Sequence, residues 1–191
     1  MSPSRTRKPA NAAGGSRHKT SAAGHTPQKD PAYARRLKQA LQQSGQSAGN
    51  HCFGCAPGNR QGLQLRFQQN LETRRVECVF RLARRFEGPP GHAHGGIIAT
   101  ILDEAMSKAN RQKGIVALTR HMSVDYLQPV PLGVKLCAIG WPVKQTGRKH
   151  TNAAEIRTLE GAVLARGAGL FVAIDPVQML RQMAAGKVAA K

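Results

Sequence analysis

Apolar and polar positions alternate along two short segments in the first half of the chain, residues 63–67 and 76–80. Such alternation is typical of β-strands that bury one face and expose the other. Four further segments have strand character, and they comprise residues 117–126, 134–143, 151–158 and 163–174. Turn signals separate these four at residues 129–133, at Thr146-Gly147 and at Glu160-Gly161. The pattern therefore predicts two strands, a central segment, and four more strands.

In the central segment the apolar residues recur at spacings of three and four, which is typical of a helix with one broad buried face. These residues are Ile97, Ile98, Ile101, Leu102, Ala105 and Met106. One long helix among consecutive antiparallel strands favours an α+β domain in which the sheet wraps around the helix.

The turn that leads into this helix, His94-Gly95-Gly96, contains the first candidate catalytic groups. Glycines let a backbone turn approach a ligand closely, and the first N–H groups of a helix have no partner within it. Such donors, together with the positive end of the helix dipole, suit the developing oxyanion of an acyl transfer. An ordinary helix start beside a solvated acidic pair explains the spacing equally well.

A carboxylate, Asp103, follows His94 by nine residues. At about 1.5 Å per residue, a helix places it roughly 13 Å further along, too far to reach the same carbonyl. If both groups serve one reaction, the carboxylate comes most simply from an antiparallel second subunit, so the spacing predicts a dimer. Asp103 falls beside the apolar face, where loss of solvent would raise its pKa.

Six stretches of the chain together form a recognisable series. They are Cys52-Phe53-Gly54-Cys55 with Gly62-Leu63, Phe86-Glu87-Gly88-Pro89-Pro90, His94-Gly95-Gly96 with Leu102-Asp103-Glu104-Ala105, Ala117-Leu118-Thr119, Val124-Asp125-Tyr126 with Pro129-Val130-Pro131-Leu132-Gly133, and Gly147-Arg148-Lys149. In this order, over about residues 52–174, they resemble the hotdog-fold acyl-CoA thioesterases of the phenylacetic-acid-degradation type, in the thioesterase superfamily. The resemblance implies an antiparallel sheet wrapped around one long central helix, and hydrolysis of an acyl-CoA thioester to a free acid and coenzyme A.

The resemblance also implies roles for single residues. In that family the N–H of the first glycine after the histidine polarises the thioester carbonyl, which points to Gly95. The acidic residue nine positions after the histidine acts as nucleophile or general base, which points to Asp103. A hydroxyl on the next strand positions the attacking group, which points to Thr119, with Ser107 as the second choice.

His94 is expected to orient the site or the carbonyl, and Gly96 to contact substrate beside it. His92 stands only two residues before His94, too close to indicate a zinc site, so we expect no metal and no cofactor. The chain departs from the family pattern at residues 88–91, Gly-Pro-Pro-Gly, where some relatives carry a polar side chain that would contact the substrate.

Arg148 and Lys149 belong to a basic turn at residues 147–150. Coenzyme A carries a pyrophosphate and a ribose phosphate, which cationic side chains bind well. A solvated hairpin tip explains the same residues equally well.

Two other functions remain open on the sequence. The first is a non-catalytic acyl-CoA-binding module whose basic tails contact nucleic acid or another macromolecule, although binding alone has no need for Asp103. The second is a hotdog hydratase, but such relatives pair an acid with a histidine on the helix, and this helix has no histidine after His94. The apolar residues of the helix are compatible with an aryl, a medium-chain or a long-chain acyl group.

The composition of the chain limits its possible partners and its domain organisation. The 191 residues include 29 Lys and Arg against 10 Asp and Glu, and the net charge of +19 suggests anionic partners, either nucleotide-like substrates or nucleic acid. We expect residues 1–50 to be a largely disordered basic tail with a short helix at 31–43, and residues 176–191 to be a basic tail or helix. Residues 51–175 suit one domain, and no apolar stretch is long enough to span a membrane.

Four cysteines are too few for a disulfide scaffold in a chain of this length, so we expect a reducing compartment. This is the cytoplasm, or the mitochondrial matrix if the basic N-terminal segment is a transit peptide. Cys52 and Cys55 form a lone Cys-x-x-Cys, for which a turn packed on the first strand is favoured over a redox or metal role. Cys78 and Cys137 lie in strand patterns and are expected to be small core residues.

Overall fold

The computed structural model describes residues 51–175 and 178–179 of the chain. The basic tail expected at residues 1–50, its short helix at 31–43, and most of the C-terminal segment expected at 176–191 lie outside the described residues.

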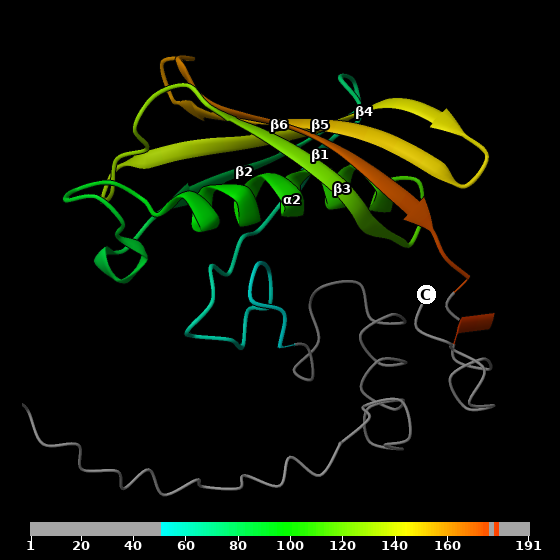
Figure 1. Ribbon diagram of the computed structural model, residues 1–191, viewed down its shortest axis with the longest axis horizontal. Coiled ribbons are helices and arrows are strands. Elements are labelled where there is room, and N and C mark those ends of the chain that lie inside the picture. Colours follow the sequence, from blue (N-terminus) through cyan, green and yellow to red (C-terminus); the bar gives the residue numbers. More distant parts are fainter. Residues whose placement is uncertain (1–50, 176–177, 180–191) are drawn as a thin grey trace, which may run out of the picture.

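A six-stranded antiparallel sheet and one long helix make up the described fold (Figure 1). The strands are β1 (Gln68–Asn70), β2 (Arg75–Arg81), β3 (Ala117–Tyr126), β4 (Lys135–Thr146), β5 (Lys149–Thr158) and β6 (Val163–Ala173). Their order across the sheet is β1-β2-β4-β5-β6-β3, so β3 forms one edge although it follows the helix directly in sequence. The 3-10 turn η2 (Arg84–Phe86) and the helix α2 (Gly95–Arg111) connect β2 to β3.

The sheet curves over α2, and the segment that begins at residue 51 lies on the opposite side of the helix (Figure 1). The helix buries its apolar face against the sheet, and its buried apolar residues are Ile98, Ile101, Leu102, Ala105, Met106 and Ala109. At Gly140 on β4 a Cβ atom would collide with the Ala105 carbonyl oxygen, so a glycine there lets sheet and helix approach closely. This packing confirms the expected α+β class and the broad buried face of the helix.

The predicted strand at residues 63–67 is wrong, because the sheet begins at Gln68. The N–H groups of Leu63 and Leu65 instead donate to the carbonyl oxygens of Phe53 and Gly54, at 2.8 and 2.9 Å. Gln64 between them has a φ of 51°. The alternating apolar residues therefore belong to a loop packed beneath the helix, where Leu65 is buried.

The other five predicted strands are confirmed, with ends that differ from the expected ones by at most three residues. Gly147 and Gly161 adopt positive φ angles of 56° and 97° in the two predicted hairpin turns. Cys78 is buried in the core as expected, whereas Cys137 is only partly buried.

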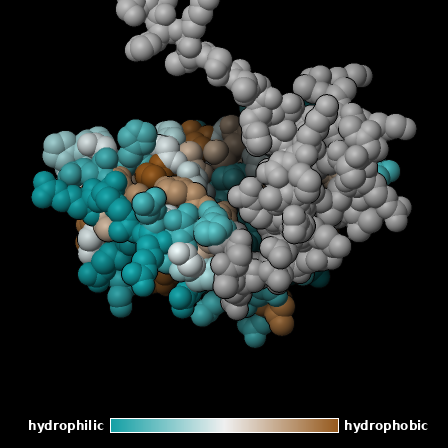
Figure 2. All heavy atoms as spheres, turned by 90° about the horizontal axis from the view of Figure 1, so that it is seen from below, coloured by the Kyte–Doolittle hydropathy of each residue, from teal (hydrophilic) through white to brown (hydrophobic). Residues whose placement is uncertain are grey.

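The face of the molecule seen from below is mostly hydrophilic where described residues form it, with smaller apolar patches (Figure 2). Among the described residues no helix is both long enough and apolar enough to cross a membrane.

Candidate active site

The start of α2 presents one backbone donor to its surroundings. His94 caps the helix, and its Nδ1 accepts a hydrogen bond from the Gly96 N–H at 3.0 Å. The Gly95 N–H has no acceptor among the described residues. Gly88 packs against this turn so tightly that a Cβ atom on it would lie 2.8 Å from the His94 Cα. Of the two glycines expected to meet substrate, Gly95 therefore offers an unoccupied N–H, whereas the N–H of Gly96 is already bonded.

Tyr126, at the end of β3, contacts the same turn. Its hydroxyl donates a hydrogen bond to the Gly95 carbonyl oxygen at 3.2 Å. No role was expected for this residue from the sequence, although it lies in one of the stretches that carry the family resemblance. The sequence places the phenol at the end of a predicted strand, but only the tertiary structure shows that this strand end meets the start of the helix.

Asp103, in the middle of α2, accepts a hydrogen bond from the hydroxyl of Thr119 on β3, with 2.7 Å between Oγ1 and Oδ1. The register of β3 against β6 shifts between Thr119 and His121. A bulge of this kind re-aims the side chains next to it. The structure thus brings together the two residues that the resemblance implied, whereas no described hydrogen bond joins Ser107 to Asp103.

Partial burial raises the pKa of Asp103 above its usual value. The hydrogen bond from Thr119 acts in the opposite direction, and the neighbouring charge of Glu104 adds to the increase. A carboxylate with a raised pKa accepts a proton more readily, which suits a general base.

One chain does not bring Gly95 and Asp103 together. They are eight residues apart on the same helix, which corresponds to about 12 Å. Tyr126 contacts the first and Thr119 contacts the second, so a single chain presents two separate polar groups along α2 and β3.

The basic turn lies at the Asp103 end of the sheet. Lys149 and Leu118 both pair with Val172, from opposite sides of β6. Arg148 and Lys149 are exposed, and the Arg148 guanidinium donates to the carbonyl oxygen of Ala173 at 3.0 Å. The turn therefore lies at the same end of the strands as Thr119, with β6 between β5 and the edge strand β3.

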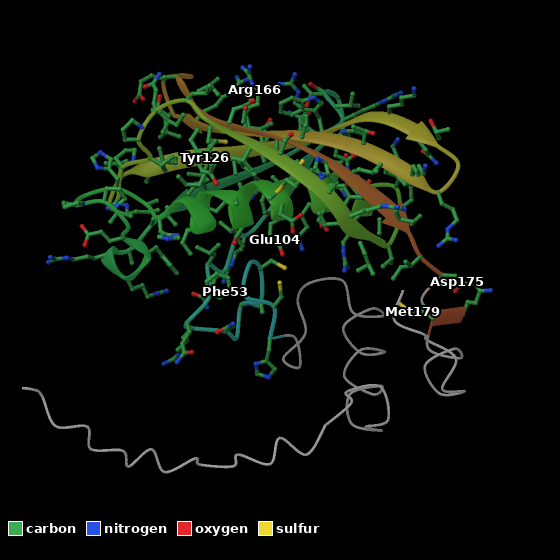
Figure 3. The ribbon with its side chains drawn as sticks, viewed as in Figure 1. Phe53, Glu104, Tyr126, Arg166, Asp175 and Met179 are labelled. Carbon is green, nitrogen blue, oxygen red and sulfur yellow. The ribbon has the colours of Figure 1, made fainter. Side chains whose placement is uncertain are left out.

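A second polar group lies on the face of α2 turned away from the sheet, where Figure 3 shows Glu104 above the loop that carries Phe53. The Cys52 thiol is 3.3 Å from Glu104 Oε1, and Lys108 Nζ is 3.1 Å from Cys55 Sγ. A hydrogen bond from Cys55 lowers the pKa of Cys52 to about 5, against the opposing effect of burial. The same hydrogen bond, together with burial, raises the pKa of Cys55, and burial raises that of Glu104.

Comparison with known proteins bears on the fold and on the family. Residues 90–165 match the sequence model of the Thioesterase superfamily. The acyl-coenzyme A thioesterase THEM4 of Xenopus laevis is 32% identical over 116 residues, which cover 60% of this chain and 52% of the relative. The chain thus spans about half the length of the curated relatives that it matches.

Solved structures show the same architecture. The crystal structure of a thioesterase superfamily protein superimposes with a TM-score of 0.61 at 34% identity, covering 64% of this chain and 63% of the other. The BH2602 protein from Bacillus halodurans, solved with CoA, gives a TM-score of 0.54 at 28% identity and covers 63% and 80% of the two chains. Residues 90–165 are thus similar to the Thioesterase superfamily, and the described domain has the hotdog fold of these solved structures.

Proposed function

We propose that the protein is an acyl-CoA thioesterase that hydrolyses an acyl-CoA thioester to a free acid and coenzyme A. The observation that carries the proposal is the half-buried Asp103 carboxylate held by the Thr119 hydroxyl, on a helix whose first N–H, that of Gly95, has no acceptor among the described residues. The names of the THEM4 relatives and the CoA in the Bacillus halodurans structure support the substrate class.

In the proposed reaction the thioester carbonyl oxygen accepts a hydrogen bond from the Gly95 N–H, at the positive end of the helix dipole. Asp103 takes a proton from a water molecule as that water attacks the carbonyl carbon. The carbon–sulfur bond then breaks, and the proton passes to the departing coenzyme A thiolate. Donors placed where negative charge develops commonly contribute a hundredfold or more to such steps. Direct attack by Asp103, followed by hydrolysis of the anhydride, uses the same two groups.

The proposed active form is a homodimer with its sites at the subunit interface, either alone or paired into a tetramer. Gly95 and Asp103 are about 12 Å apart in one chain, and β3 lies at the edge of the sheet with most of its residues exposed. Two β3 strands (Ala117–Tyr126) paired antiparallel about their centres would set Thr119 of one chain opposite Val124 of the partner subunit, two residues from the partner's Tyr126. That pairing would bring each Asp103 toward the partner's Gly95 and complete two equivalent sites.

Arg148 and Lys149 are proposed to bind the phosphates of coenzyme A. Both are exposed and belong to the turn at the Asp103 end of the sheet. Guanidinium and ammonium groups bind phosphate strongly, and positive charge there would hold the nucleotide end of the substrate while the thioester reaches the interface.

The test is coenzyme A release from a panel of aryl and straight-chain acyl-CoAs, with wild type and Asp103→Asn compared at matched folding by circular dichroism. We expect turnover by the wild type, and a loss of about a hundredfold or more in the variant, as is typical for a lost catalytic base. Glu72→Gln, which removes an exposed carboxylate after β1, is the matched control and should remain active.

A wild type that binds an acyl-CoA but releases no coenzyme A from any member of the panel would contradict the proposal. The protein would then be an acyl-CoA-binding module.

A further inference from the structure

Three metal-ligating side chains from distant parts of the sequence meet beneath α2. The donor atoms of Cys52, Cys55 and Glu104 all lie within 4.8 Å of one another. Tetrahedral zinc, with bonds of about 2.3 Å to sulfur and 2.0 Å to oxygen, places its ligand atoms roughly 3.5–4 Å apart. Small side-chain rotations would therefore bring the three donors to coordination distance.

The backbone holds this arrangement in place. Gly54, between the two cysteines, contacts Glu104 so closely that a Cβ atom would collide with the carboxylate side chain. The Cys52 carbonyl oxygen accepts the Ala56 N–H at 3.1 Å, which closes the turn. Hydrogen bonds from Leu63 and Leu65 to the carbonyl oxygens of Phe53 and Gly54 fix the loop from its other side. The two thiols are thus presented to the helix by a rigid loop.

Charge and chemistry favour a particular class of ion. Two thiolates and a carboxylate carry three negative charges, and a divalent ion neutralises two of them. Lys108, one helical turn after Glu104, supplies the third positive charge, with Nζ 3.1 Å from Cys55 Sγ and 3.7 Å from Glu104 Oε2. Sulfur donors select zinc-like ions over magnesium and calcium, which prefer oxygen ligands.

We propose that Cys52, Cys55 and Glu104 bind one thiophilic divalent metal ion of the zinc class, with Lys108 as a charge-balancing donor to Cys55. The Cys-x-x-Cys spacing is the one used by many zinc sites, and three protein ligands leave a fourth position for water or another donor. The ion would join the loop at residues 52–55 to α2 next to Asp103. This metal site is separate from the proposed thioesterase site, and the proposal does not depend on thioesterase activity.

The test uses the full-length, tag-free protein, stripped of metal by a chelator under reducing conditions and titrated with Zn²⁺ or Co²⁺ alone. We expect one ion per chain, a thiolate-to-cobalt charge-transfer band, and a rise in melting temperature with Zn²⁺ that Mg²⁺ does not reproduce. Cys52→Ser and Cys55→Ser should weaken binding at least about tenfold and reduce the band. Cys137→Ser removes a partly buried cysteine outside the cluster and should leave the metal affinity unchanged.

Glu104→Gln keeps both thiols and tests the third ligand even if a cysteine variant folds poorly. It should weaken metal binding while retaining the thiolate band. A wild type that shows no band and retains no ion would overturn the proposal, as would equal binding by Cys52→Ser. Recovery of a Cys52–Cys55 disulfide after mild oxidation, without any metal retention, would also overturn it and identify a dithiol redox site instead.

Discussion

The Thr119 hydroxyl donates a hydrogen bond of 2.7 Å to the Asp103 carboxylate, across the space between the edge strand β3 and the helix α2. The contact joins two residues from different elements at a point where the strand register shifts. It orients the carboxylate and opposes the increase in its pKa that burial causes.

Replacement of Thr119 by valine keeps the shape of the side chain and removes the hydroxyl. A hydrogen bond to a charged group is typically worth about 1.5–3 kcal/mol, so we expect kcat for acyl-CoA hydrolysis to fall by roughly tenfold to a hundredfold. Steady-state rates of coenzyme A release give the measurement. Thr73→Val, in the exposed turn after β1, is the matched control, and equal activity of the two variants would argue against a role for this contact.

Gly95→Pro removes the proposed oxyanion donor with little expected cost to the fold. Proline is favoured at the first position of a helix, and His94 before it has φ −63° and ψ 139°, which suits a residue preceding proline. A Cβ atom at position 95 would meet Tyr126 only at 3.6 Å. We expect a loss in kcat of about a hundredfold to a thousandfold.

Gly95→Ala controls for the added carbon atoms, because it retains the N–H. It should lose much less activity than the proline variant in the same assay of coenzyme A release. Near-wild-type turnover by a folded Gly95→Pro protein would show that this N–H is not the donor.

Mixed oligomers test whether the site is shared between subunits. Chains with Gly95→Pro and chains with Asp103→Asn are each expected to be inactive alone. If Gly95 and Asp103 act across the interface, each mixed dimer has one intact site, and random pairing should restore about a quarter of wild-type activity. Denaturation and refolding of the two variants together, followed by rate measurement, provides the test. No recovery in a mixture shown to contain mixed dimers would place both groups of each site in one chain.

Glu155 on β5 provides a prediction on the pH dependence of stability. The residue is 4% exposed, and its carboxylate contacts Arg157 and Arg166. Figure 3 shows Arg166 on the outer side of the sheet. Burial alone would raise the pKa of Glu155, but the hydrogen bonds and charges of the two arginines outweigh it and hold that pKa below the usual value of 4.5.

Because the folded-state pKa is lowered, these contacts stabilise the fold fully above the unfolded-state value and lose their effect as the pH falls through the folded-state value. We expect Glu155→Gln to destabilise the protein by about 1–2 kcal/mol at neutral pH, between the values for exposed and buried charge pairs. Urea unfolding at a series of pH values should show this difference shrinking below about pH 4.5. A difference that is independent of pH would mean that the arginines do not stabilise the carboxylate.

The periodicity of the sequence was sufficient to predict the helix, five of the six strands and the α+β class, because each depends on local alternation of apolar and polar residues. The separation of Gly95 and Asp103 followed from their spacing on that helix, and the prediction of a dimer rests on the same spacing. Residues 63–67 show the limit of this reasoning. Their alternation is that of a strand, but their backbone donors bind the loop at residues 52–55 instead of a neighbouring strand.

Only the tertiary structure decided which polar groups meet. Thr119 on β3, and not Ser107, donates a hydrogen bond to Asp103, and the end of the same strand places Tyr126 against Gly95. Cys52 and Glu104 are 52 residues apart in sequence yet in contact. Local patterns report which face of an element is buried, whereas contacts between elements depend on strand order, register and helix packing, which the whole chain determines together.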